Sequence, residues 1–169
     1  MLEADFRKAM RTLTSAVCVV STAHAGRRFG MTATSVTSLS AEPPSILVCI
    51  NQAASVHEPV SKSQRLCANI LRADQIDLAQ AFSSKITAEA RFCHGRWRDN
   101  ADGMPYLGDA QANVFCNVEA VYAYATHSIV VGKVTNVMVG AGVAPLIYQD
   151  GRYTVGLGEG IDWVVSIGG

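Results

Sequence analysis

The stretch NVFCNVEAVY, residues 113–122, alternates apolar and polar side chains as a half-buried β-strand does. The run Ile129–Val134 that follows is rich in β-branched residues, so two or three strands are expected between Asn113 and Val139. Strands this close along the chain pair most simply as antiparallel neighbours. This part of the sequence therefore predicts an antiparallel sheet.

Further strands are expected on both sides of this stretch. They are 16–22 and 29–34, which flank a turn at 24–28, then 45–51, 66–71, and the two arms of 146–155, a hairpin around Asp150-Gly151. The run 45–51 is brief and follows Pro43-Pro44, which favours an interior strand over a helix. Six or more strands predict a mainly β protein, with an antiparallel barrel as its architecture.

Short helices are expected to plug this barrel. Phe6, Ala9, Met10 and Leu13 follow a helical period, and this amphipathic helix is expected to lie on the core as a lid. A second helix is expected over 74–82, capped by Asp74, and a weaker helical pattern covers 55–63. The segment 91–107 is expected to be a long loop.

Composition limits the class of protein. The 169 residues are 49% apolar and 17% charged, with 14 basic and 14 acidic side chains. A formal net charge of zero provides no general attraction to nucleic acid or to a membrane surface, so neither is expected as a partner. The low charged fraction predicts that some surface is hidden in a subunit interface or under a ligand. No linker divides the chain, so residues 1–169 are expected to form one domain with a peripheral tail after about residue 157.

The cysteines predict neither disulfides nor a metal site. They are odd in number, widely spaced and mostly set in apolar runs, at Cys18, Cys49, Cys67, Cys93 and Cys116. The acidic N-terminus lacks the pattern of a signal peptide, so a cytoplasmic location is expected.

The segment Gly30–Ser40 holds six hydroxyl side chains in eleven residues, where a strand gives way to an expected loop. One interpretation is a polar strand edge with local turns. The other is a ligand cradle, in which hydroxyls and free backbone N–H groups bind a polar ring edge or a phosphate, and Gly30 permits close approach. A second cradle is possible at Asn51–His57, where a strand ends and a helix begins.

Several separate motifs, in order, resemble the short-chain flavin reductases, which are the reductase components of two-component flavin monooxygenases. They are GMTATS at 30–35, SLSAEPP at 38–44, Asn51 with Ser55, DLAQAF at 77–82, Arg91-Phe92 with Gly95, HSI at 127–129 before GKV at 132–134, and PLIY at 145–148 with GRY at 151–153. The resemblance covers about residues 5 to 157.

This resemblance implies a homodimeric split antiparallel β-barrel of the FMN-binding type, with flavin at the subunit interface. It implies hydride transfer from NADH or NADPH to FMN or FAD, and release of reduced flavin to a partner monooxygenase. Neither Gly140-Ala141-Gly142 nor the glycines at 156–160 match a Rossmann fingerprint, so the nicotinamide must bind elsewhere.

The resemblance also implies roles for particular residues. The flavin ring edge is expected at Thr32, Ala33, Thr34 and Ser35, the ribityl chain and phosphate at Cys49, Ile50, Asn51 and Ser55, and closure of the pocket at Phe82 and Ser83. His127 is expected to face the nicotinamide as the catalytic residue, and Tyr153 to help hold that cofactor. Hydride transfer requires mainly that two rings be stacked in contact, which is consistent with the lack of a catalytic triad.

Two departures from the family pattern affect these roles. Ala125-Thr126-His127 stands where the family usually has Gly-Asp-His, so the usual carboxylate beside the histidine is missing. Ser55-Val56-His57 replaces the frequent Ser-x-Thr, and His57 is a possible extra donor to the flavin. A flavin-binding electron carrier or sensor, or a related reductase of a corrinoid precursor, are the alternative functions.

Overall fold

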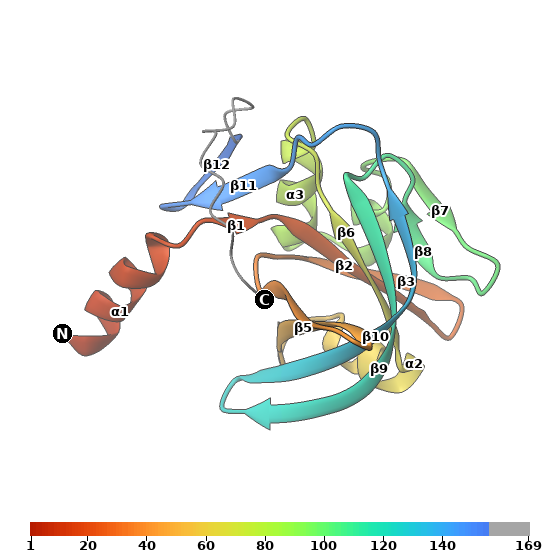
Figure 1. The fold of residues 1–169 in the computed structure, drawn as a ribbon, viewed down its shortest axis with the longest axis horizontal. Helices are drawn as coiled ribbons and strands as arrows, with labels where there is room; N and C mark the ends of the chain where they lie inside the picture. The colour runs from red at the N-terminus through yellow and green to blue at the C-terminus, as the bar shows by residue number, and fades with distance from the viewer. Residues whose placement is uncertain (156–169) are drawn as a thin grey trace.

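Seven strands form the main sheet of the computed structural model, which describes residues 1–155 (Figure 1). Their order is β3-β2-β6-β9-β10-β5-β4, and every neighbouring pair is antiparallel. The strands are β2 (Cys18–His24), β3 (Arg27–Ala33), β4 (Val36–Ala41), β5 (Pro44–Asn51), β6 (Arg65–Ile70), β9 (Ala112–Tyr124) and β10 (His127–Val139). The mainly β class and the antiparallel pairing are thus confirmed.

The hairpin β9–β10 is the centre of this sheet. Each strand has 13 residues, and the hairpin runs from the Tyr124–His127 pair to the Ala112–Val139 pair. β6 adds to the outer side of β9, and β5 adds to the outer side of β10. The alternating stretch 113–122 therefore lies in an interior strand, as its pattern predicts.

The sheet curls around the largest of three clusters of buried apolar side chains in the described residues. Its two edge strands, β3 and β4, are consecutive in the chain and only Thr34 and Ser35 separate them, so the ends of the sheet come close together. The core inside this curl contains fully buried side chains from several strands, among them Val20, Val48, Ile50, Leu66 and Ala68. Complete closure into a split barrel stays a prediction.

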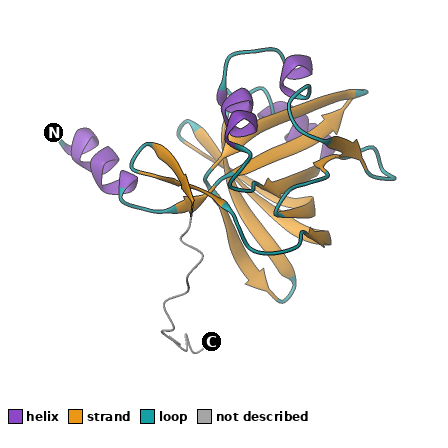
Figure 2. Cartoon of the chain, turned by 90° about the horizontal axis from the view of Figure 1, so that it is seen from above, coloured by secondary structure: helices purple, strands orange, loops and turns teal. Residues whose placement is uncertain are grey.

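Three short helices pack beside the sheet (Figure 2). They are α2 (His57–Ser63), α3 (Ile76–Ser83) and α4 (Ala88–Arg91). The helix expected over 74–82 is present, but Asp74 does not cap it, because its carboxylate lies 3.6 Å from Arg72 Nε. Gln75 occupies the cap position instead and its side-chain oxygen accepts the backbone N–H of Arg72 at 2.9 Å.

The first helix does not lie on the core, which corrects the expectation of a lid. α1 (Leu2–Arg11) has no buried residue and projects away from the main sheet (Figure 1). Phe6 is 60% exposed and Leu13 is 59% exposed. The helix end is held by the backbone N–H of Asp150, which donates to the carbonyl of Arg11 at 2.9 Å, so α1 follows a peripheral hairpin rather than the core.

That hairpin belongs to a small second sheet of β1 (Ser15–Ala16), β11 (Leu146–Gln149) and β12 (Arg152–Val155). Asp150 and Gly151 have φ of 48° and 77°, the left-handed conformation that a tight hairpin turn requires, so the predicted Asp-Gly turn is confirmed. The tail expected after residue 157 lies outside the described residues.

Two segments that the sequence predicts to be loops contain β-strands. Within 91–107, β7 (Trp97–Asp99) pairs with β8 (Pro105–Leu107), because the Asn100 side chain accepts the N–H groups of Asp102 and Met104 and closes the turn. The polar stretch after Ala33 forms β4, because it pairs with the apolar β5. Neither pairing has a strong signal in its own residues.

Candidate functional site

The end of β5 and the start of β10 meet at one place on the sheet. Asn51 is the register partner of His127 across these strands. The Asn51 side-chain oxygen accepts the N–H of Ala53 at 2.8 Å, and its carbonyl accepts the N–H of Ala54 at 2.9 Å. These bonds hold the chain in a tight turn that leads to Ser55 and α2.

The first proposed cradle contacts the end of β5, the strand that leads into the second cradle. Ser35 Oγ donates to the carbonyl of Cys49 at 2.8 Å, and the N–H of Cys49 donates to the carbonyl of Ser35 at 3.3 Å. Ala33 and Ile50, on either side, are buried in the core. The structure therefore brings together the segments 33–35 and 49–51, with Ser35 and Cys49 only partly buried at the surface.

α3 is held against β3 by two contacts. Thr32 Oγ1 donates to the carbonyl of Ala79 at 2.6 Å. The Phe82 ring lies over Gly30, where a Cβ atom would stand 2.7 Å from Phe82 Cε1. The group that approaches Gly30 closely is thus the side chain of Phe82. Phe82 is 1% exposed, and the centroid of its ring lies 5.1 Å from the ring centroids of both Phe92 and Trp97.

Ser83 and Tyr153 form another group, where α3 meets β12. Burial raises the pKa of the Tyr153 hydroxyl, the nearby Ser83 side chain lowers it, and Tyr148 raises it. The rings of Tyr148 and Tyr153 lie 5.3 Å apart. Thr34 is exposed and lines a cavity of about 300 Å³ that also has Tyr148 in its wall.

His127 is exposed at the start of β10. Its Nδ1 lies 2.9 Å from Thr126 Oγ1, so a neutral hydroxyl contacts the imidazole where the resemblance leads one to expect a carboxylate. Among residues 1–155, no hydrogen bond or aromatic contact joins His127 to Tyr153.

Arg91 connects three of these segments, although no role follows for it from the sequence. Its guanidinium donates to the carbonyl of Gly30 at 3.1 Å, to Ser55 Oγ at 3.3 Å and to the carbonyl of Ser84 at 2.7 Å. Its Nε is buried without a hydrogen-bond partner in the described part of the chain. The only signal in the sequence is the Arg91-Phe92 pair, which belongs to the resemblance but does not reveal these contacts.

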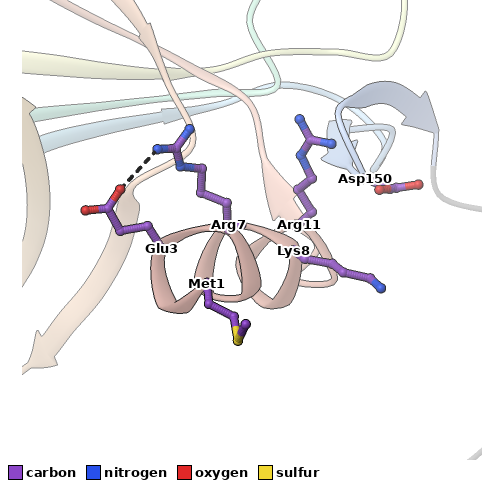
Figure 3. Close-up of a pocket in the computed structure, with 7 residues that line it drawn as sticks. Met1, Glu3, Arg7, Lys8, Arg11 and Asp150 are labelled. Carbon is purple, nitrogen blue, oxygen red and sulfur yellow. Dashed lines mark ion pairs between the residues drawn. The ribbon is translucent and has the colours of Figure 1, made fainter.

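A cavity of about 670 Å³ lies elsewhere, between α1 and the β11–β12 turn (Figure 3). Its lining includes five charged residues and none of the predicted site residues: Met1, Glu3, Ala4, Arg7, Lys8, Arg11 and Asp150. Arg7 and Glu3 form an exposed ion pair at 3.8 Å, and Arg11 points to the same side of the helix as Arg7 (Figure 3).

Two features are absent from residues 1–155. No group of three or more His, Cys, Asp or Glu in this range could hold a metal ion. None of its helices is both long enough and apolar enough to cross a bilayer.

Comparison with known proteins identifies the family. The model of the flavin reductase like domain matches residues 10–156. The chain belongs to the flavin reductase-like family. It is 38% identical to the reductase component of the FADH(2)-dependent resorcinol hydroxylase of Rhizobium sp. (strain MTP-10005), over 88% of this chain and 84% of that protein. It is 37% identical to the FMN reductase (NADH) RutF of Variovorax paradoxus (strain S110), over 89% of this chain and 84% of that protein.

A solved structure of the same family has the same fold. It is BorF, the flavin reductase component of a bacterial two-component tryptophan halogenase, with a TM-score of 0.83 and 26% identity over 90% of this chain and 97% of that chain. The resemblance to flavin reductases inferred from the motifs is therefore confirmed.

Proposed function

We propose that this protein is an NAD(P)H:flavin oxidoreductase that reduces FMN or FAD and supplies the reduced flavin to a separate monooxygenase. The observation that supports this most is the match of residues 10–156 to the flavin reductase family. Two relatives matched over most of their length add support, one named as a reductase component and one as an FMN reductase (NADH). The reaction moves a hydride from the nicotinamide to the flavin, and a proton from solvent completes the reduced flavin.

The residues present fit a flavin. The Ser35 and Ser55 hydroxyls and the exposed turn at Asn51 offer polar groups to a ring edge and a ribityl chain. The guanidinium of Arg91, which reaches Ser55, adds the positive charge that a phosphate favours. No carboxylate from a described residue contacts these groups.

We assign the flavin ring edge to Thr32, Ala33, Thr34 and Ser35, and the ribityl chain and phosphate to Cys49, Ile50, Asn51 and Ser55. Ala33 and Ile50 are buried, so they would act through their backbone. Phe82 would support the pocket from behind, because its ring is buried under Gly30, and Ser83 would lie at the rim with Tyr153.

His127 and Tyr153 are proposed to hold the nicotinamide cofactor. Both side chains lie at the surface at least in part, but on different elements, β10 and β12. Two copies of a split barrel in a homodimer would complete each site from both subunits, as the resemblance implies. In this proposal residues 1–169 form one domain.

Replacement of His127 tests this function. His127→Ala is expected to lower kcat/KM for NADH about fivefold to a hundredfold at saturating flavin, because a lost hydrogen bond in the transition state costs about 1 to 3 kcal/mol. Flavin affinity, measured separately by fluorescence, should stay unchanged. His94→Ala, which removes an exposed histidine in another loop, is the matched control.

Three results would contradict the proposed reaction or the proposed role of His127. NADH consumption that does not rise in proportion to added flavin would indicate a carrier or sensor rather than a reductase. Unchanged kcat/KM in His127→Ala would assign His127 to structure, and a loss confined to flavin binding would move it to the flavin side.

A further inference from the structure

Three polar contacts tie the start of β10 to the loop after β5. The backbone N–H of Gln52 donates to the carbonyl of Thr126 at 3.0 Å, and Gln52 Nε2 donates to the carbonyl of His127 at 3.0 Å. His57 Nε2 lies 2.9 Å from Ser128 Oγ. The contacts thus involve the carbonyl of His127 itself, the carbonyl of Thr126 before it and the hydroxyl of Ser128 after it.

Both residues of the contact between His57 and Ser128 are held in place by buried neighbours. Ser128 is 2% exposed, so its hydroxyl has lost access to water and depends on the imidazole for a partner. His57 is the first residue of α2, and the buried Val56 and Val60 anchor that turn in the core. The imidazole therefore reaches β10 from a fixed position.

The same loop carries residues proposed to bind flavin. Asn51 is the last residue of β5 and Ser55 lies between β5 and α2. Gln52 follows Asn51, and His57, the first residue of α2, follows Ser55 after one residue. Any shift of this loop relative to β10 would change the distance between the flavin and His127. Hydride transfer is sensitive to such shifts because the rings must lie in contact.

We infer that Gln52 and His57 are positioning residues that hold His127 in register with the flavin-binding loop. This inference rests on the proposed function, because it needs His127 on the nicotinamide side and Asn51 and Ser55 on the flavin side. It also changes the role expected for His57, whose Nε2 points to Ser128. A threonine at this position, being shorter, could not make the same bridge, so the bridge is tied to this chain's Ser55-Val56-His57 sequence.

The test measures the rate constant of reduction of bound FMN by saturating NADH in a stopped-flow experiment, together with the FMN dissociation constant. His57→Ala and Ser128→Ala are each expected to slow reduction about threefold to tenfold, the loss of one hydrogen bond. The double variant should be no slower than the slower single variant. His57→Gln should recover most of the rate, because its amide can reach Ser128. His94→Ala is the control and should match the wild type.

The decisive arm repeats His57→Ala in the His127→Ala background. If His57 acts through His127, its removal there should have no further effect on the rate. Losses that multiply, or a failure of His57→Gln to recover the rate, would overturn the inference. If His57→Ala does not fold, Ser128→Ala and its combination with His127→Ala give the same comparison.

The two proposals fail in different ways. A wild-type protein that cannot reduce FMN with NADH overturns the proposed function and, with it, the positioning role. A wild-type protein that reduces FMN while His57→Ala and Ser128→Ala retain its rate overturns the positioning role alone.

Discussion

Single hydroxyl groups in the proposed flavin cradle are already bonded inside the protein. Thr32 donates its proton to Ala79 and Ser35 donates its proton to Cys49, both at main-chain carbonyls. A hydroxyl whose proton is used in this way still has a free lone pair. These two side chains can therefore accept hydrogen bonds from a flavin while they keep α3 and β5 in place.

Position 30 requires a glycine because the ring of Phe82 lies directly over it. Gly30→Ala is expected to destabilise the fold by about 1 to 3 kcal/mol, because the new Cβ would overlap Phe82 and that ring is enclosed by Phe92 and Trp97. The measurement is the midpoint of thermal unfolding. The double variant Gly30→Ala/Phe82→Leu should recover part of the loss by freeing space. Equal midpoints for wild type and Gly30→Ala would contradict the contact.

The five cysteines are free thiols, and they should differ sharply in reactivity. Burial raises the pKa of Cys18 and of Cys116 to about 12, and burial together with Cys116 raises that of Cys67. Since only the thiolate reacts, these three should resist a chromogenic disulfide reagent in the folded protein even at pH 9. Cys93 is exposed and should give one fast reaction per chain.

The control for this labelling is Cys93→Ser, which should lose the fast phase. In the denatured protein all five thiols should react with the reagent. Fast reaction of three or more thiols in the native protein would be inconsistent with the buried positions of Cys18, Cys67 and Cys116.

At the level of elements, Arg91 joins β3, the loop before α2 and the end of α3. Its three bonds reach Gly30, Ser55 and Ser84, which are distant from one another in the chain. A planar guanidinium donates to several acceptors in fixed directions, whereas the three donors of a lysine sit on one rotatable ammonium group. Arg91 therefore holds the proposed phosphate end of the site together.

Arg91→Ala is expected to lower the unfolding midpoint and to weaken FMN binding at least about tenfold, since charge-assisted hydrogen bonds contribute about 1.5 to 3 kcal/mol. Arg91→Lys should fall between this variant and the wild type. Arg96→Ala is the matched control, because the Arg96 side chain is 82% exposed and its pair with Asp109 at 3.6 Å is a surface ion pair. Equal effects of Arg91→Ala and Arg96→Ala would refute the role.

At the scale of the whole molecule, two elements carry several of the exposed large apolar side chains. One is α1, where Leu2 is 84% exposed and Phe6 is 60% exposed. The other is the turn end of the β9–β10 hairpin, where Tyr122 is 61% exposed and Tyr124 is 78% exposed. Exposed apolar surface of this kind is typical of proteins that associate. The homodimer proposed above would cover part of it.

Sedimentation equilibrium at micromolar concentration tests the dimer. The chain mass is 18.0 kDa, so a homodimer should sediment at twice 18.0 kDa, about 36 kDa. Dilution that dissociates the dimer into monomers should also reduce activity, because each site would lose the residues that the partner subunit contributes. A monomer with full activity would rule the dimer out.

The sequence by itself determined the elements whose signals are local. Alternation over 113–122 predicts β9, and the Asp150-Gly151 turn predicts the β11–β12 hairpin, because side-chain period and turn conformation depend only on neighbouring residues. The motifs also identified the family, since they occur in order along most of the chain.

Contacts between distant segments were decided only by the tertiary structure. The helical period over Phe6–Leu13 predicts α1 but not that it projects from the core, because the hydrogen bond that holds it comes from Asp150. Likewise β4 is a strand because β5 pairs with it. The guanidinium of Arg91 donates to the carbonyl of Gly30, which lies 61 residues earlier in the chain. His57 was expected near the flavin, yet its partner is Ser128, 71 residues away. A sequence pattern reports the state of a segment, whereas a side chain's partner depends on how remote segments pack in three dimensions.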